Sequence, residues 1–283
     1  MSFDPLSAAT SAAVAVPVHL HQIAFSKAAL AAVEPGYAVL DNLANERPDW
    51  YEYWPIRRYL QTRTLDEGAW YGFLSPKFGS KTGLSHAQVQ AFVRTHAAQS
   101  DVVIFSPQPD MGAFFLNVFE QAETFDAGFI DAATDFLQAI GRPAGLRQMV
   151  MDSRQVVFSN YFVARPAFWR EWLALNEQLF ALCEDTASPL RDALVKPTAY
   201  SGGAQRKVFL LERLASYLLV TQPRWRSRAA DPFTFAWSTS RLSQHRVEAF
   251  ISDALKVAMR EQGYPEYLLA FSEVRQRLFG TPG

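Results

Sequence analysis

Segments with the pattern of β-strands alternate with segments of helical pattern from residue 18 to residue 220. Strands are predicted at 18–26, 37–43, 69–75, 101–107 and 155–164. Between and after them, amphipathic or apolar patterns predict helices at 55–63, 84–98, 116–125, 127–141, 166–184 and 207–220. Strands that alternate with helices form α/β folds, in which helices cover both faces of a mostly parallel sheet. We therefore expect an α/β sandwich with a mostly parallel central sheet.

Composition and pattern divide the chain into three parts. Residues 1–16 are rich in Ala and Ser and predict a loose N-terminal segment. Residues 17–225 hold the alternating pattern and predict the α/β domain. Residues 226–283 begin with irregular sequence and end in two helical patterns, at 246–260 and 265–279. This last part predicts a helical C-terminal extension packed on the α/β domain.

Charge, cysteine content and hydropathy exclude several classes of protein. The chain has 27 Lys and Arg against 28 Asp and Glu, so it lacks the basic excess of a nucleic-acid-binding protein. Its one cysteine, Cys183, can form neither an internal disulfide nor a cysteine-based zinc site. No apolar run approaches the roughly 18 residues of a membrane-spanning helix. No basic residue precedes Lys27, although a secretory signal begins with one. We expect a cytoplasmic protein that does not bind nucleic acid.

Several common site motifs are missing from the sequence. The stretch GSKTG is not a phosphate-binding loop of the Walker type, because Ser75 and Ser80 stand where that motif needs glycine. No Gly-x-Gly-x-x-Gly follows the first strand, and no Gly-x-Ser-x-Gly marks a hydrolase nucleophile. His19 and His21 share one face of a predicted strand, but no third metal ligand lies near them in the sequence. We therefore expect no metal site at these histidines.

Polar residues gather where the predicted strands end. Ligands of α/β sheets bind outside the carboxyl ends of the strands. One crevice should therefore be surrounded by Ser26, residues 75–81, residues 106–110 and Asn160. Asn160 lies among the apolar residues of a predicted strand, where an amide is unfavourable without a partner. It either holds a neighbouring loop or faces a ligand.

Positive charge follows one apolar strand abruptly. Lys77 and Lys81 come directly after WYGFLS, and Arg57 lies on the preceding predicted helix. Cations that converge with backbone N–H groups of a glycine-containing loop bind diphosphates. The sequence therefore predicts a site for an anionic ligand, with a larger contribution from Lys77 than from Lys81. The alternative is a surface loop that carries two solvated lysines.

A charged pair interrupts the apolar pattern of residues 207–220. Glu212 and Arg213 lie there side by side, and an isolated buried carboxylate is costly. The pair predicts either an ion pair that holds the helix or a functional carboxylate.

A basic and aromatic stretch, residues 223–237, follows that helix. It contains Arg224, Trp225 and Arg226. Arginines next to aromatic rings suit an anionic or lipid-linked glycan, or a partner at a membrane face. The alternative is a solvated loop that covers the core.

The order of four segments resembles a group of bacterial glycosyltransferase-like domains from surface-polysaccharide loci, which are related to the DUF4422 family. The segments are WYGFLSPKF, NVFEQAETF, FSNYFVARPAFWREWL and KVFLLERLASYLL, and the resemblance covers residues 18–220. In these relatives an Asn-Met-Phe-Ile strand leads into a Trp-containing helix, and a Glu-Arg-Leu helix follows. The matching residues here are Asn160-Tyr161-Phe162-Val163 and Glu212-Arg213-Leu214.

The resemblance implies a GT-A-like fold, a nucleotide-sugar donor, and transfer to a glycan or lipid-linked glycan acceptor in polysaccharide synthesis. GT-A enzymes usually hold a divalent metal with Asp-x-Asp at the end of the strand equivalent to 69–75. Here Ser75-Pro76-Lys77 stands in that place, and the whole sequence contains no Asp-x-Asp. We therefore expect that a divalent metal is not required, with Mn²⁺ or Mg²⁺ as the alternative. Peripheral contact with the inner membrane face or with an assembly complex is also expected.

The resemblance also suggests roles for individual residues. A carboxylate would deprotonate the acceptor hydroxyl while cations stabilise the departing diphosphate. Glu212 is preferred as this base, and Asp110 is the other candidate. The expected donor-binding residues are Ser26, Arg57, Ser75, Lys77, Lys81, Asn160 and Arg213, and the expected acceptor-binding residues are Arg224, Trp225 and Arg226. The main alternative is a non-catalytic docking module of the same fold in a glycan-assembly complex, and a hydrolase ranks third.

Overall fold

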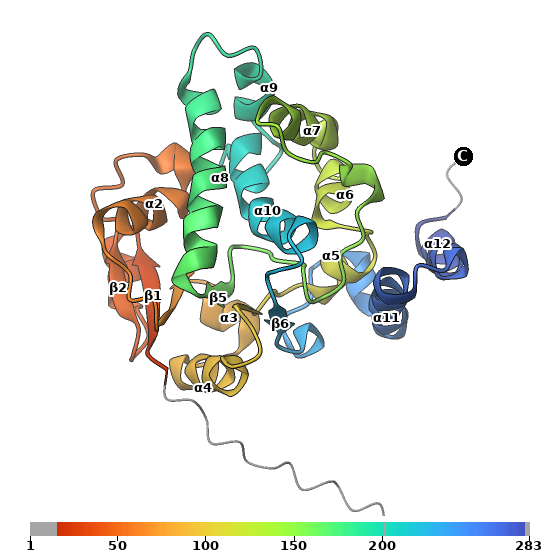
Figure 1. Ribbon diagram of the computed structural model, residues 1–283, viewed down its shortest axis with the longest axis horizontal. Helices are drawn as coiled ribbons and strands as arrows, with labels where there is room; N and C mark the ends of the chain where they lie inside the picture. Colours follow the sequence, from red (N-terminus) through yellow and green to blue (C-terminus); the bar gives the residue numbers. More distant parts are fainter. Residues whose placement is uncertain (1–15, 201, 281–283) are drawn as a thin grey trace, which may run out of the picture.

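A six-stranded sheet runs through the molecule (Figure 1). Its strands lie in the order β2-β1-β3-β5-β4-β6. The computed structural model describes residues 16–200 and 202–280, so residues 1–15 of the expected loose segment lie outside the described residues. The strands are β1 (Val18–Ala24), β2 (Ala38–Asp41), β3 (Trp70–Leu74), β4 (Val102–Ile104), β5 (Phe162–Ala164) and β6 (Ser227–Ala229). Of these six strands, β5 runs antiparallel to its neighbours β3 and β4, and the other pairs are parallel. The α/β class and the mostly parallel sheet are confirmed, in an arrangement consistent with a GT-A-like sandwich.

Most of the longer helices form close to the bounds that the sequence predicts. They are α2 (Tyr53–Thr62), α4 (His86–His96), α6 (Val118–Glu123), α7 (Phe129–Ala139), α8 (Pro166–Glu184), α10 (Arg206–Thr221), α11 (Arg246–Gln262) and α12 (Pro265–Phe279). Four short helices were not expected, namely α1 (Lys27–Ala31), α3 (Phe78–Thr82), α5 (Pro109–Ala113) and α9 (Arg191–Val195). A helix of five residues is too short to show a helical period in the sequence.

Local signals explain where several helices begin. Ser85 caps α4, and its side chain forms a capping box with Gln88, because each side chain bonds the backbone N–H of the other. Pro166 occupies the first position of α8, where its missing N–H is not needed. Asp49 and Glu52 have the sequence spacing of a capping box before α2, but this box does not form. Asp49 lies in a 3-10 helix and binds basic side chains instead, and Glu52 makes no side-chain capping bond.

Each face of the sheet has its own apolar core, because successive strand residues point to opposite faces. Val102 and Ile104 belong to the larger core, to which α8 and α10 contribute Trp172 and Leu214. Val103, between the two β4 residues, belongs to the second core, which contains apolar residues of α4. The sheet is therefore covered on both faces, as the continuous apolar character of its strands predicts.

The central strand β5 is shorter than expected. A strand was predicted over 155–164, but only Phe162–Ala164 pair with the sheet. Ser159 and Asn160 have φ values of 56° and 54°, in the left-handed region, so the backbone turns away before β5 begins. Close packing holds β5 against β3, because a Cβ on Gly72 would lie 2.8 Å from Cγ2 of Val163. Only glycine fits there without a shift.

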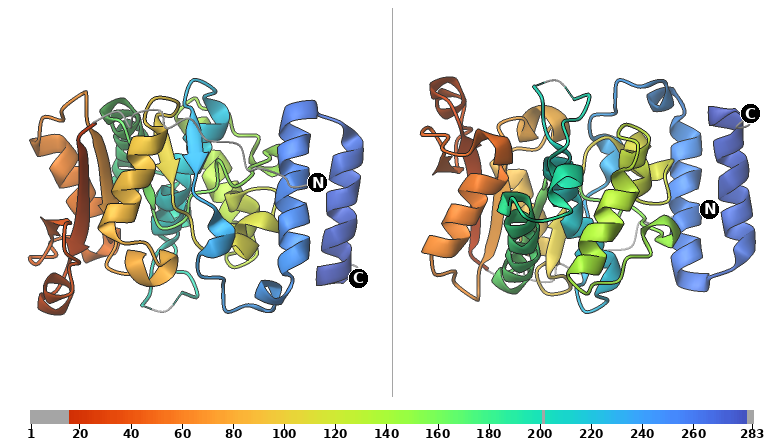
Figure 2. Two further views of the ribbon diagram at one scale, coloured as in Figure 1. Left: turned by 90° about the horizontal axis from the view of Figure 1, so that it is seen from below. Right: turned by 90° about the horizontal axis from the view of Figure 1, so that it is seen from above.

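The C-terminal part contributes to the sheet as well as forming a helical extension. The residues of β6 were expected in the extension, but they add the edge strand beside β4. The helical part proper is the hairpin of α11 and α12, which lies at the end of the molecule opposite β2 (Figures 1 and 2). Lys256 of α11 is fully buried and donates to the backbone oxygens of Gly112, at 2.6 Å, and Phe115, at 3.1 Å. Among the described helices, none is long and apolar enough to cross a membrane.

Candidate active site

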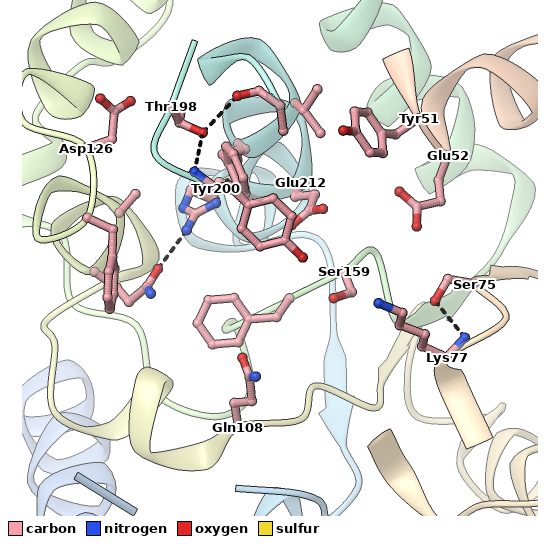
Figure 3. A pocket seen from close by; sticks show the side chains of 18 of the residues that line it. Tyr51, Glu52, Ser75, Lys77, Gln108, Asp126, Ser159, Thr198, Tyr200 and Glu212 are labelled. Carbon is pink, nitrogen blue, oxygen red and sulfur yellow. Dashed lines mark hydrogen bonds between the residues drawn. The ribbon is translucent and has the colours of Figure 1, made fainter. Parts of the chain in front are cut away.

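A pocket of about 620 Å³ lies at the carboxyl ends of three strands (Figure 3). It is lined by Phe25 after β1, Ser75 after β3 and Gln108 after β4. This is the edge of the sheet where the sequence predicts a crevice, because ligands of α/β sheets bind there. The opposite wall comes from α6, α10 and the segment around Tyr200. The pocket thus lies between the carboxyl ends of the strands and segments that follow β4 in the chain.

Besides Asp126, which pairs with Arg206, two carboxylates of distant origin line this pocket. Glu52 precedes α2 and Glu212 lies on α10. The pKa of Glu212 is raised to about 7, chiefly by burial and then by the neighbouring charge of Glu52. Arg213, Lys81 and the backbone N–H of Ser159 oppose this rise. Burial also raises the pKa of Glu52. A carboxyl group that titrates near neutral pH can take up a proton during a reaction.

The two predicted lysines lie in the same pocket. Lys81 is half-buried on α3, and its Nζ donates to Oγ of Ser159 at 3.1 Å. The ammonium group also lies 5.5 Å from the ring centroid of Tyr161. Burial lowers the pKa of Lys81, against the attraction of the two carboxylates. Lys77 lines the pocket as well but is exposed. The lysines are thus part of a concave site and not only of a solvated surface loop.

Ser159 connects the acidic and basic groups of the pocket. Its side chain accepts the Lys81 bond, and its backbone N–H faces Glu212. Nearby, Oγ of Ser75 lies 2.5 Å from the buried hydroxyl of Tyr161. These bonds hold the end of β3 against the turn that precedes β5. One short turn therefore positions groups from β3, α3 and α10.

Backbone strain is concentrated at this pocket. Five described residues other than glycine have positive φ values, and Tyr51, Gln108 and Ser159 among them line the pocket. Asn160 also has a positive φ value and lies next to Ser159. Such conformations persist where the surrounding structure enforces them, and they cluster at functional sites. The residues with positive φ thus surround the same pocket as the carboxylates and the lysines.

Arg213 lines the pocket but is occupied by structural bonds. Its guanidinium donates to the oxygens of Val118 at 2.7 Å, Phe209 at 2.8 Å and Gln121 Oε1 at 2.6 Å. Burial lowers its pKa to about 10. No ion pair joins Arg213 to Glu212 in the part of the chain that the structure describes. Arg213 therefore ties α10 to α6 and leaves Glu212 available to the pocket.

Three residues expected at the site lie outside this pocket. Asp110 is buried and accepts bonds from the backbone N–H of Ser238 at 3.0 Å and from the Ser238 hydroxyl. Ser26 caps α1 by accepting the N–H of Ala29 at 3.1 Å. Arg57 pairs with Glu177 at 2.5 Å, on the α8 side of α2. Each side chain is therefore used within the protein, and the expected grouping of these three with the lysines is wrong.

Asn160 is buried beside the pocket and does not line it. Its Oδ1 has no hydrogen-bond partner among the described residues. Asn tolerates the left-handed conformation better than most residues. The left-handed turn before β5 therefore explains why an amide residue stands here, and the expected contact of its side chain with a ligand stays a prediction.

The expected acceptor residues lie at the opposite ends of the strands from the pocket. Arg224 and Trp225 both bind the Glu171 carboxylate, at 2.5 Å and 3.0 Å. Arg226 binds Asp101, which directly precedes β4. These residues stand at the amino ends of β4 and β6, whereas the pocket lies at the carboxyl ends. Their geometry gives no support to a shared site with Glu212.

Several pocket residues were not found from the sequence. In the sequence Glu52 fits a helix cap, and its charge acts on Glu212 of α10 only because the fold brings distant parts of the chain together. The aromatic side chains of Phe25, Phe125 and Tyr200 line the pocket and are 52%, 62% and 56% exposed. Large exposed aromatic groups at a concave surface indicate a place where a ligand binds. Sequence alone does not reveal which aromatic residues stay exposed.

The described residues contain no group of three or more His, Cys, Asp or Glu side chains that could hold a metal ion. At the end of β3 the side chains are a hydroxyl, a proline ring and an ammonium group, from Ser75, Pro76 and Lys77. These are poor ligands for Mg²⁺ or Mn²⁺, which prefer carboxylate oxygens.

No protein-family model matches the chain, and no curated protein matches its sequence. Among solved structures, the chain is similar to the WbbM bifunctional glycosyltransferase in its apo form, with a TM-score of 0.46 and 13% sequence identity. The match covers 79% of this chain and 46% of the WbbM chain, so this chain spans about half the length of that protein. At this TM-score the likeness supports no conclusion about function, which rests on the pocket itself.

Proposed function

We propose that the chain is a glycosyltransferase that moves a sugar from a nucleotide-sugar donor to a hydroxyl of a glycan or lipid-linked glycan. The observation that carries this proposal is the meeting of Glu52 and Glu212 with Lys77 and Lys81 in one pocket at the carboxyl edge of the sheet. The sequence resemblance to domains of bacterial surface-polysaccharide loci supports the pathway. A contact with the membrane face or an assembly complex belongs to the same proposal.

Glu212 is the proposed general base. Its carboxylate takes the proton of the acceptor hydroxyl while the acceptor oxygen bonds to the anomeric carbon of the donor sugar. The bond from that carbon to the diphosphate oxygen breaks, and the nucleoside diphosphate leaves. A pKa of about 7 suits this task, because a base works best when its pKa is near the working pH. Glu52 contributes by keeping this pKa high.

Lys81 and Lys77 are the proposed partners of the departing diphosphate. Ammonium groups aimed at developing negative charge stabilise the transition state of such a displacement. Lys81 is suited to this role because Ser159 fixes its Nζ at 3.1 Å. We propose that this pair replaces the metal of an Asp-x-Asp site, and that Mn²⁺ or Mg²⁺ is required only if the lysines prove dispensable.

A ligand panel followed by a transfer assay tests the function. Nucleoside diphosphates and their sugars are screened in EDTA, and a ligand that binds the native state raises the melting temperature. With an active donor and acceptor, Glu212→Gln should lower kcat by about a hundredfold or more and keep donor affinity. Glu67→Gln is the matched control, because Glu67 is exposed and paired with Arg170 away from the pocket.

Three results would count against the proposal. No binding to any member of the panel would remove the donor. Binding without turnover, with every acceptor class tried, would favour the docking module of a glycan-assembly complex. Full turnover in a folded Glu212→Gln protein would exclude Glu212 as the base.

A further inference from the structure

Gln108 has an unusual backbone conformation at the floor of the pocket. Its φ and ψ are 59° and 61°, in the left-handed region. The residue is neither glycine nor asparagine, and it stands between Pro107 and Pro109. A following proline favours extended backbone in the preceding residue, so local sequence preference does not produce this conformation. The fold around Gln108 must enforce it.

A segment from the C-terminal part of the chain holds Gln108 in place. We call residues 235–240 the strap. The N–H of Gln108 donates to the oxygen of Ala236 at 2.8 Å, and the N–H of Ala236 donates to the oxygen of Lys81 at 2.9 Å. One strap residue thus links Gln108 directly to the helix that carries the pocket lysine.

Asp110 fixes the strap in turn. Its carboxylate accepts the N–H of Ser238 at 3.0 Å, the hydroxyl of Ser238, and the hydroxyl of Ser240 at 3.4 Å. Asp110 is fully buried, so its position is set by packing. Phe235 anchors the start of the strap in the second apolar core. The strap is therefore fixed at both ends.

The side chain of Gln108 has no partner of its own. It lines the pocket, is half-buried, and makes no hydrogen bond to any residue that the structure describes. Figure 3 shows its amide group extending from the lower wall of the view into the pocket, with Tyr200 on the facing wall. An amide offers two donors and an acceptor without charge. A sugar hydroxyl both donates and accepts, so it can pair with either end of this amide.

We propose that Gln108 binds hydroxyl groups of a sugar ring in the pocket, and that Asp110 is a positioning residue that acts on Gln108 through the strap. The inference rests on the proposed function, because the lysines then take the diphosphate and leave the uncharged amide to the sugar. The ring belongs either to the donor or to the acceptor. Asp110 thereby has a role in the site without touching the substrate.

The test compares probes with and without a sugar. The probes are uridine, guanosine and thymidine diphosphates, each alone and carrying glucose or galactose, and the neutral disaccharides maltose and lactose, all measured by calorimetry or NMR. Gln108→Asn keeps an amide and tolerates the left-handed backbone, but its amide is one methylene shorter. Gln108→Ala removes the amide. Both variants should bind the sugar-bearing probes about 5- to 30-fold more weakly, as expected for one or two hydrogen bonds. Affinity for the bare diphosphate should stay within about twofold.

The positioning role has its own readout. Asp110→Ala should weaken the binding of sugar-bearing probes more than that of the bare diphosphate, whose partner Lys81 is bonded to the strap only through its backbone oxygen. A purely structural defect would lower both affinities by the same factor. If Asp110→Ala does not fold, Ser238→Ala removes from the strap one hydroxyl, with its bonds to Asp110 and to Ser240, and leaves Asp110 in place.

The outcomes separate this inference from the proposed function. A loss confined to the nucleotide sugars assigns the ring to the donor, and a loss confined to the disaccharides assigns it to the acceptor. Wild-type binding that Gln108→Asn and Gln108→Ala leave unchanged overturns the inference and spares the glycosyltransferase proposal. Disaccharide binding that depends on Gln108, with no nucleotide binding, supports the inference and overturns the glycosyltransferase proposal. A wild-type protein that binds none of the probes overturns both.

Discussion

Replacing Lys81 with methionine should weaken diphosphate binding more than the same change at Lys77. Methionine keeps most of the length of the side chain and removes its charge. Lys81 is half-buried and fixed by Ser159 at 3.1 Å, so its bond to a phosphate oxygen forms in a partly dry site. A charge-assisted bond of this kind contributes about 1.5 to 3 kcal/mol. The expected loss of affinity is therefore roughly 10- to 150-fold.

Lys77 is exposed, and its charge is screened by water. An exposed ion pair contributes about 0.2 to 1 kcal/mol. Lys77→Met should therefore lower the affinity only about 1.5- to 5-fold. The burial of the two side chains thus reverses the order that the sequence alone suggests. Lys27→Met, an exposed change outside the pocket, controls for the loss of one positive charge.

Isothermal titration calorimetry with a nucleoside diphosphate, in EDTA and at two salt concentrations, measures these effects. The Lys77 contribution should fall with added salt more than the Lys81 contribution, because buried charges are screened less. Equal losses in the two variants would refute the reasoning from burial. Wild-type binding that disappears in EDTA and returns with Mn²⁺ would refute the assignment of the lysines as the main partners of the diphosphate.

Two further predictions follow from the titration of Glu212 and from the ion pair of Arg57. Because the folded-state pKa of Glu212 is about 7, above its ordinary value, kcat/KM should rise with pH through about 7. Between the unfolded and the folded pKa of Glu212 the native state binds an extra proton, so ionising Glu212 above pH 7 destabilises the folded protein. Glu212→Gln should therefore stabilise the protein at pH 8 and not at pH 4. An activity profile that rises near pH 4 would contradict the raised pKa on which both predictions rest. Arg57→Met should lower the free energy of unfolding by about 1 to 2 kcal/mol in urea titrations, through the loss of the Glu177 pair. Diphosphate affinity should stay within about twofold in this variant, and a larger fall would return Arg57 to the site.

The layout of the sheet was predictable because it depends on patterns that are local in the sequence. Helix α8 forms over the predicted residues, since Pro166 marks its start and an apolar stripe runs through it. The strand predicted at 155–164 failed at Ser159 and Asn160, where apolar neighbours on both sides concealed a left-handed turn. Helix α3 was not predicted, because a segment of five residues that contains a glycine has the sequence character of a loop. Periodicity detects elements only when they span several turns or pleats.

The site was predictable only to the extent that it follows from strand ends. The place of Ser75, Lys77 and Lys81 in the pocket lining was predictable because ligand crevices lie beyond the carboxyl ends of parallel strands. The predicted site omitted Glu52 and placed Arg57 beside the lysines, and both errors have the same physical reason. The first meets Glu212, and the second meets Glu177, through contacts between distant parts of the chain. No local pattern records which partner a charged side chain will meet after folding.

The order of the strands along the chain also determines when the sheet can be completed during synthesis. β1, β2 and β3 are neighbours in sequence and can pair as soon as they leave the ribosome. β4 has neither of its neighbours until β5 and later β6 have been made. At about 5 to 20 residues per second, β4 waits several seconds for β5 and longer for β6. An apolar strand with both edges unpaired is a template for wrong pairing during that time. Changes in the short strand β5 should therefore lower the yield of folded protein more than they lower the stability of the finished fold.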